Sequence, residues 1–191
     1  MFAICLASAA ACSGEDSIRI IEEQMERIAR RDQEALGMLY QRTKSAVYGF
    51  VLSILKNTQD AEDVLQDTYI QIYTAADTYL AKGKPMAWIL TIARNQAMMK
   101  LRDRKKTADI PQEDWENCLA ENPGLSHEDR LVLQTVLGTL SGEELQIVML
   151  HAAAGFRHRE IASLLSLPLS TVLSKYNRAM KKLRVKLTEG E

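Results

Sequence analysis

The spacing of apolar residues at intervals of three and four constrains the fold of this chain more than any other feature. Ile18, Ile21, Met25 and Ile28 follow this spacing, and so do the apolar and small residues between positions 61 and 76. It marks one buried stripe on an α-helix, and no segment shows the strict alternation typical of a strand. We therefore expect an all-α protein with helices around residues 18–28, 36–55, 60–76, 85–101, 127–140, 142–153, 158–165 and 170–187.

Several helix ends carry local signals. The second helix should end near Asn57, because asparagine tolerates the left-handed conformation that ends many helices. Thr58 or Asp60 then has the side chain needed to cap the third helix. Ser141 followed by Glu144 three residues later is a capping box, which predicts a helix start at that point.

Charged residues are segregated along the chain. The formal net charge is only −1, but residues 94–106 hold six basic residues against one acidic, and residues 157–186 hold eight against one. Residues 60–67 carry four acidic residues and residues 109–129 carry seven, with no lysine or arginine in either segment. Opposite blocks of this strength favour contacts with a polyanion and with a charged partner.

A change of pattern divides the chain into two parts. Residues 105–128 lose the helical spacing, turn acidic and contain two prolines and a glycine. We therefore expect two small helical domains joined by an acidic linker. The expected boundaries are a disordered extension at 1–16, a first domain at 17–106, a linker at 107–127, a second domain at 128–187 and a tail at 188–191.

The cysteines and the first residues bear on the compartment. Cys5, Cys12 and Cys118 show no metal-ligand or disulfide spacing, which favours reduced thiols in the cytoplasm and no bound metal. Residues 1–12 are apolar enough to invite comparison with a signal peptide, but no lysine or arginine precedes them. We expect an extension or a start site placed too far upstream, and no membrane insertion.

The most specific local pattern lies near the C-terminus. Residues 158–165 predict a short amphipathic helix, residues 166–169 a tight turn, and Ser170 the start of a long basic helix. Ala162, Leu167 and Val172 have the sizes and spacing that hold two such helices at the angle of a helix-turn-helix. A two-helix hairpin with a solvated basic face is the simpler alternative. The residues expected to face a DNA major groove and its phosphates are Ser174, Lys175, Arg178, Lys181 and Lys182.

Two other helices each present a polar face opposite the buried stripe. On the third helix this face is acidic with one isoleucine, which suits docking onto a basic partner but also describes plain solvated surface. Its members are Asp60, Asp63, Gln66, Asp67 and Ile70. On the fourth helix, amide, aromatic and basic side chains suit capture of single-stranded bases, although Trp88 is equally suited to the core. These side chains are Trp88, Thr91, Asn95, Met98 and Arg102.

Taken in order, four segments make the chain resemble a bacterial sigma factor of the extracytoplasmic-function (ECF) group, within the sigma-70 family. The segments are DAEDVLQDTYIQIY at 60–73, PMAWILTIARNQAMMKLRDRKK at 85–106, LSGEELQIVML at 140–150 and REIASLLSLPLSTVLSKYNRAMKKLR at 159–184. The resemblance implies a sigma region 2 helical bundle over about residues 30–106 and a region 4 helix-turn-helix over 128–187. It also implies core RNA polymerase and promoter DNA as partners, an anti-sigma factor as a restraining partner, and a linker along the RNA-exit path.

The resemblance also assigns roles to single positions. It implies polymerase contacts for Asp63, Gln66 and Asp67, and capture of a flipped −10 base by Asn95. Arg94 and Arg102 would hold the neighbouring phosphates. In region 4 it implies −35 contacts for Leu173, Ser174, Asn177 and Arg178. Leu173 and Met180 stand where basic residues are common in the family, and Ser166 stands at a turn position often filled by glycine. These departures bear on the −35 sequence preference and not on the fold.

Two other classes of protein remain as alternatives to a sigma factor. One is a helix-turn-helix transcription regulator whose N-terminal bundle is a sensor or dimerisation module. The other is a helical enzyme, which the sequence disfavours because it has no phosphate-binding glycine loop, nucleophile elbow or HExxH motif. We expect no catalytic residue and no cofactor.

Overall fold

A computed structural model of the chain describes residues 15–81, 83–106, 138–152 and 154–188. These residues are almost entirely helical and contain no strand, which confirms the expected all-α fold. The elements are α2 (Glu15–Ala29), α3 (Gln33–Leu55), α4 (Thr58–Ala75), the 3-10 turn η1 (Ala76–Thr78), α5 (Pro85–Lys106), α8 (Gly142–Ala152), α9 (His158–Leu165) and α10 (Leu169–Thr188).

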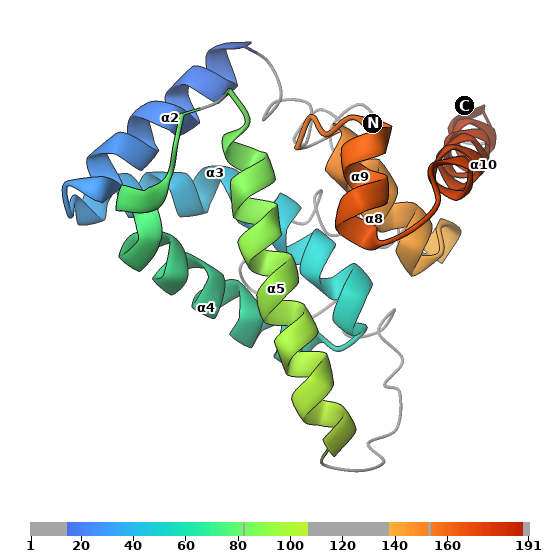
Figure 1. The fold of residues 1–191 in the computed structure, drawn as a ribbon, viewed down its shortest axis with the longest axis horizontal. Coiled ribbons are helices and arrows are strands. Elements are labelled where there is room, and N and C mark those ends of the chain that lie inside the picture. Colours follow the sequence, from blue (N-terminus) through green and yellow to red (C-terminus); the bar gives the residue numbers. More distant parts are fainter. Residues whose placement is uncertain (1–14, 82, 107–137, 153, 189–191) are drawn as a thin grey trace.

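Helices α2 to α5 form the N-terminal bundle (residues 15–106). The long helix α3 is its centre and packs against α2, α4 and α5, while α5 crosses the bundle in front of α3 (Figure 1). The apolar stripes anticipated from the spacing are those that are buried, including Met25 and Ile28 on α2, Val64 and Ile72 on α4, and Ala93 on α5. Burial of such stripes supplies most of the stability of short helices.

Local interactions define where the bundle helices begin and end. The Asp32 carboxylate accepts hydrogen bonds from the backbone N–H groups of Glu34 and Ala35, which caps α3. Lys56 ends α3 in the left-handed conformation with φ 51°. The side chain of Asn57 caps α4 by accepting from the Asp60 N–H at 2.8 Å. The expected left-handed residue and the expected cap were therefore each placed one or more residues too far along the chain.

Helices α8 to α10 form the C-terminal unit (residues 138–188). Ile147, Ile161 and Val172, one from each helix, are fully buried. The chain turns between α9 and α10 at Ser166, which has φ 56° and donates its N–H back to the end of α9. This serine thus adopts the left-handed conformation that glycine accommodates most readily. Helices α9 and α10 with this turn form the expected helix-turn-helix.

The observed ends agree with most of the expected ranges. Helix α2 begins at Glu15, two residues before the expected start of the first domain, and α10 extends to Thr188. The Ser141 and Glu144 capping box is confirmed, because each residue accepts a hydrogen bond from the other's backbone N–H. The expected linker at 107–127, most of the expected helix at 127–140 and residues 1–14 lie outside the described residues.

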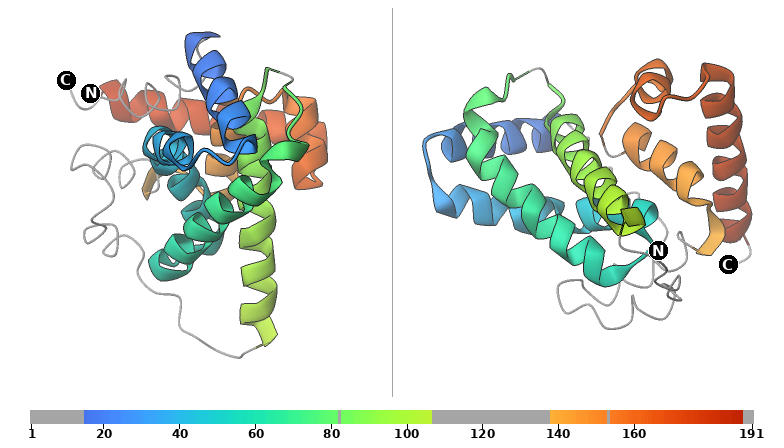
Figure 2. Two further views of the ribbon diagram at one scale, coloured as in Figure 1. Left: turned by 90° about the vertical axis from the view of Figure 1, so that its left-hand side faces the viewer. Right: turned by 60° about the horizontal axis from the view of Figure 1, so that its bottom comes forward.

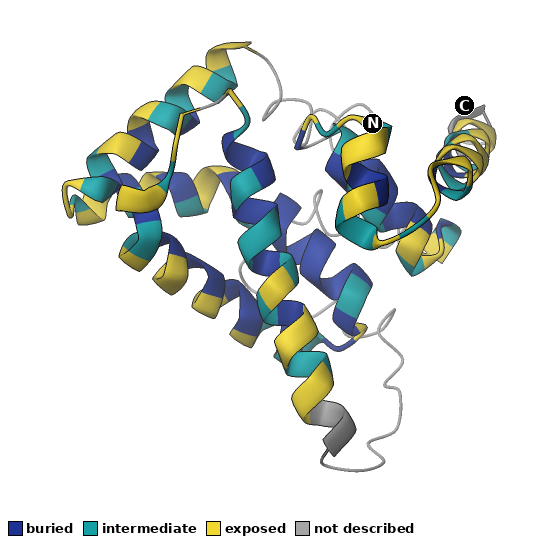
Figure 3. Ribbon diagram, viewed as in Figure 1, coloured by how far each residue is buried: buried dark blue, intermediate teal, exposed yellow. Residues whose placement is uncertain are grey.

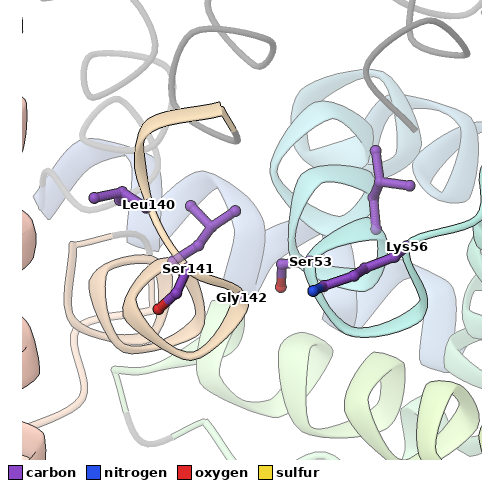
Figure 4. A pocket seen from close by; sticks show the side chains of 7 residues that line it. Ser53, Lys56, Leu140, Ser141 and Gly142 are labelled. Atoms are coloured by element: carbon purple, nitrogen blue, oxygen red, sulfur yellow. The ribbon is translucent and has the colours of Figure 1, made fainter. Parts of the chain in front are cut away.

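The C-terminal unit packs on one side of the N-terminal bundle (Figure 2). The start of α8 meets the end of α3, and Leu52, Ser53, Lys56, Leu140 and Leu145 line a small open pocket there (Figure 4). At Gly142 the two backbones come so close that an added Cβ would lie 2.8 Å from the Ser53 carbonyl oxygen.

An ion pair supports this contact. Lys84, just before α5, donates to both carboxylate oxygens of Glu160 on α9 at 3.0 and 2.9 Å. Its ammonium also lies 6.0 Å from the centroid of the Phe156 ring. The pKa of Glu160 lies below its ordinary value because its carboxylate accepts from the Arg157 backbone N–H and from Lys84.

In the part of the chain that the structure describes, no helix is long and apolar enough to cross a membrane.

Candidate nucleic-acid interface

Helix α10 presents one exposed stripe on the side away from its buried residues. Its buried residues are Val172, Ala179 and Leu183, at spacings of seven and four. The opposite side carries five of the seven residues predicted to face the −35 element. These are Leu173, Ser174, Asn177, Arg178 and Lys181, all exposed. The stripe begins with apolar and hydroxyl groups and ends with cations.

The other two predicted residues are half-buried and paired within the C-terminal unit. Lys175 contacts Glu143 at 2.8 Å, and Lys182 contacts Glu144 at 2.7 Å. The Glu144 carboxylate is 3% exposed and also accepts from the Ser141 N–H. Burial raises the pKa of Glu144, but the Lys182 and Ser141 hydrogen bonds outweigh burial, so the pKa lies below its ordinary value. Lys182 therefore joins α10 to α8.

Helix α5 exposes three of its six candidate residues. Asn95, Met98 and Arg102 are exposed at spacings of three and four. Exposed segments predominate towards the C-terminal end of α5 (Figure 3). Thr91 and Arg94 are half-buried, and the Thr91 hydroxyl donates to the Ala87 carbonyl. The exposed trio has the amide, thioether and guanidinium groups that can contact unstacked bases and phosphates.

Trp88 combines the two roles considered for it, a core residue and an exposed aromatic ring that could stack on a base. Its ring is half-buried and packs against the apolar core. It also contacts the Tyr79 ring, with centroids 5.3 Å apart and planes inclined at 59°. Part of the indole remains accessible at the start of α5.

The predicted acidic face of α4 is present, and Lys100 on α5 modifies it. Asp63, Gln66, Asp67 and Ile70 are exposed on one side, with Ile70 62% exposed. Lys100 lies 3.0 Å from Asp63 and 3.4 Å from the half-buried Asp60. The hydrogen bond to Asp63, followed by the contact with Asp60, raises the pKa of Lys100 above its ordinary value despite partial burial. Asp67 and Ile70 have no such partner among these contacts.

An aromatic cluster holds the three helices of the C-terminal unit together. The rings of His151 and His158 stack with centroids 4.4 Å apart, and Tyr176 meets both edge-on. The His151 Nδ1 pairs with the Phe156 carbonyl oxygen, whereas the buried Nε2 of His158 has no hydrogen-bond partner. Burial, and then the neighbouring His151, lower the pKa of His158.

The functional relationships that sequence reasoning missed are contacts between distant segments. Neither the Lys100 pairing with α4 nor the Lys182 pairing with α8 has a signal in the local spacing. Leu169, which extends the exposed stripe of α10 by one turn, follows the same spacing as Leu173 and could have been found. Within the described ranges no group of three or more histidine, cysteine or carboxylate side chains is arranged to hold a metal ion.

The two helical units with a basic recognition helix define a DNA-binding protein of the helix-turn-helix class. Family models assign it further. The model of sigma-70 region 2 matches residues 39–107, and that of sigma-70 region 4 matches residues 130–183. The chain belongs to the sigma-70 family and is an ECF sigma factor, a transcription initiation factor. The region 2 match accounts for the bundle that the alternative interpretation assigned to a sensor.

Relatives and a solved structure are consistent with this assignment. The chain is 28% identical over 169 residues to the ECF RNA polymerase sigma factor SigK of Mycobacterium sp. (strain KMS), covering 84% of this chain and 86% of that one. It is 27% identical over 171 residues to SigK of Mycobacterium tuberculosis (strain ATCC 25177 / H37Ra), covering 86% and 91%. The fold resembles CnrH, solved in complex with the cytosolic domain of CnrY, with TM-score 0.54, 23% identity and coverage of 90% and 99%.

Proposed function

We propose that this sigma factor directs promoter-specific initiation through three separate surfaces. The exposed face of α4 binds core RNA polymerase, the exposed face of α5 captures the melted −10 element, and the exposed stripe of α10 reads the −35 element as duplex. The domain expected at residues 17–106 carries the first two surfaces, and the domain expected at residues 128–187 carries the third. No step requires a cofactor.

The observation that carries the proposal is the stripe on α10. A recognition helix must bury one side against its own domain and leave the other free to enter the major groove. The stripe from Leu173 to Lys181 meets this requirement, and α10 contains no acidic residue. We assign base and phosphate contacts to the five exposed residues, and we assign Lys175 and Lys182 first to the structure of the C-terminal unit.

The α4 surface is best suited to a basic partner that also offers an apolar contact. Asp67, Gln66 and Ile70 are exposed together, so one partner helix can contact all three. Asp63 forms an ion pair with Lys100, and this pair weakens the attraction of Asp63 for a basic partner. We therefore assign the larger share of polymerase affinity to Asp67 and Ile70.

On α5, Asn95 is the residue that we assign to base capture. Its amide can donate to and accept from a base edge, and it is exposed between Arg94 and Met98. Arg102, two turns beyond Asn95, is placed to hold a phosphate. Trp88 and Thr91 lie at the partly buried end of the face, where the melted strand would enter.

Two further assignments follow from the family. CnrH was solved with the cytosolic domain of CnrY, and RpoE of Bartonella quintana with an anti-sigma factor. We propose that an anti-sigma factor likewise restrains this chain, and that the chain acts in the cytoplasm, where the polymerase and the chromosome are.

Pull-down of core RNA polymerase tests the α4 assignment. Asp67→Arg should reduce capture by tenfold or more, because it opposes a basic partner with a like charge. Asp77→Arg, at an exposed acidic position on η1, serves as the matched control and should leave capture unchanged. Equal capture by the parent and by Asp67→Arg would refute the assignment.

In-vitro transcription with the assembled polymerase tests the DNA assignments. Asn95→Ala should relax the preference for the −10 base while the polymerase is still captured. Arg178→Ala should weaken −35 binding and reduce the salt dependence of binding by about one unit of slope if its guanidinium meets a phosphate. Unchanged promoter preference in both variants would contradict the assigned surfaces.

A further inference from the structure

The first two turns of α10 expose two leucines side by side. Leu169 is 36% exposed and Leu173 40% exposed. Residues four apart on a helix are neighbours on the same face, so the two side chains form one small apolar patch. The hydroxyl-bearing Ser170 and Ser174 lie beside them on the exposed side of the helix.

The packing of the protein leaves part of this patch uncovered. The core contacts of α10 come from Val172, Ala179 and Leu183 on its other side. Tyr176 and Met180 add partly buried contacts, whereas Leu169 and Leu173 keep 36% and 40% of their surface exposed. The leucines are therefore free to contact something outside the chain.

The surroundings of the patch indicate what that partner is. The twenty residues of α10 include five lysines and arginines before residue 186 and no aspartate or glutamate. Arg178 and Lys181 are exposed on the same stripe as the leucines. A surface with this charge favours a polyanion, and the residues at the start of a recognition helix are those that reach the base edges.

We propose that Leu169 and Leu173 contact the C5-methyl groups of thymines in the major groove, and thereby make thymine a determinant of the −35 element. This inference rests on the proposed function of α10 as the −35 recognition helix. The thymine methyl is the apolar group that a base pair presents in the major groove, whereas guanine presents only acceptors there. Burial of a methyl against leucine removes apolar surface of both from water.

The same chemistry disfavours a G·C pair at these positions. A leucine side chain has no donor for the O6 and N7 of guanine and no acceptor for the amino group of cytosine. Covering those groups with leucine would leave them without water and without a partner, which is unfavourable. An arginine at position 173 would have the opposite preference, because its guanidinium pairs with guanine through two hydrogen bonds.

The test uses the full chain assembled with core RNA polymerase and a promoter library randomised at the −35 element. After the preferred duplex has been selected, each thymine is replaced in turn by deoxyuridine, which removes only the methyl group. We expect one or two positions at which this change weakens binding about fourfold, the value of one buried methyl. The protein is unaltered in this arm, so folding does not affect the result.

Variants then connect the methyl group to the leucine. In Leu173→Ala one of these positions should become insensitive to deoxyuridine, and in Leu173→Arg the selected base there should change from thymine to guanine. Val185→Ala, which truncates a 45% exposed residue further along α10, is the matched control and should retain the parent's sensitivity. Circular dichroism of each variant checks that the helices are intact.

The outcomes separate this inference from the function on which it rests. If a −35 element is selected and Arg178→Ala weakens its binding, but no thymine is sensitive to loss of its methyl, the methyl-reading inference is wrong and the proposed function stands. If Leu173→Ala weakens capture of polymerase while deoxyuridine sensitivity persists, the patch binds protein and the inference is also wrong. If no −35 element is selected at all, the proposed function of α10 fails first.

Discussion

Replacing Lys182 with alanine should destabilise the C-terminal unit more than its position on a DNA-facing helix suggests. The Lys182 ammonium lies 2.7 Å from a Glu144 carboxylate that is 3% exposed. Without it, Glu144 keeps the Ser141 N–H and faces burial with no cation beside it. The charged form would then be disfavoured, so the pKa of Glu144 should rise in the variant.

The expected cost lies between two limits. Exposed ion pairs contribute about 0–1 kcal/mol, whereas removal of one partner of a buried pair costs about 3–5 kcal/mol. Only Glu144 is buried here, since the Lys182 side chain is 39% exposed. We therefore expect a loss of about 2 kcal/mol at neutral pH, which corresponds to roughly thirtyfold more frequent opening.

The sign of the pH dependence follows from the direction of the pKa shift. Because the pKa of Glu144 is lowered in the folded state, its ionised carboxylate stabilises the fold at neutral pH. This stabilisation is lost as the pH falls through the folded-state pKa. The difference between the parent and Lys182→Ala should therefore be largest near neutrality and should shrink in acid.

Amide hydrogen exchange of the full chain measures the opening of α8 directly. Lys181→Ala, at the adjacent exposed position, is the matched control and should exchange as the parent does. Adding Glu144→Gln to Lys182→Ala should restore much of the protection, because glutamine also fits the capping box without a charge. Equal exchange in Lys182→Ala and Lys181→Ala, or no restoration in the double variant, would refute the reasoning.

Three further predictions concern the contacts between elements. Gly142→Ala should separate α8 from α3, because a Cβ placed 2.8 Å from the Ser53 carbonyl oxygen forces a shift that costs about 1–3 kcal/mol. X-ray scattering should show a larger radius of gyration, and an unchanged radius would contradict the close contact. His158→Phe should remove part of the acid lability of the chain. Because the pKa of His158 is lowered in the folded state, the contribution of its neutral ring to the free energy of unfolding falls as the pH drops through the ordinary histidine range. The thermal unfolding midpoints of the parent and the variant should therefore differ more at pH 5.5 than at pH 7.5. Lys100→Ala should lower the free energy of unfolding by about 1 kcal/mol, because the variant loses two carboxylate contacts on α4. Urea denaturation measures this difference. A difference near zero would show that these surface ion pairs do not stabilise the fold.

The fold was largely predictable because apolar spacing reports directly which side of each helix is buried. The stripe on α4 and the packing of Ala162 and Val172 in the helix-turn-helix were both anticipated and are buried. The start of α4 was less predictable, since Asn57, Thr58 and Asp60 all have side chains able to cap a helix. Asn57 is the cap because its backbone is extended while the next residue is already helical.

The candidate site was predictable to the same extent and for the same reason. The helix pattern assigned Ser174 and Arg178 to the DNA-facing side of α10, and both are exposed there. It gave no information on the partners of Lys175 and Lys182, since the carboxylates that hold them are more than thirty residues away in the chain. Spacing along one helix predicts which residues share a face. It does not predict which side chains of another helix pair with those residues.

The contact between α3 and α8 has a consequence for how readily the chain engages a promoter. The −10 and −35 elements are about 25 base pairs apart, or roughly 85 Å of duplex at 3.4 Å per pair. A compact chain of this length is only about 42 Å across. The N-terminal bundle and the C-terminal unit therefore cannot reach both elements while they are joined at Gly142 and by the Lys84 to Glu160 ion pair. Affinity for a complete promoter is therefore reduced by the fraction of molecules that are open. Every change that weakens the closed contact should raise initiation in proportion, until opening no longer limits it.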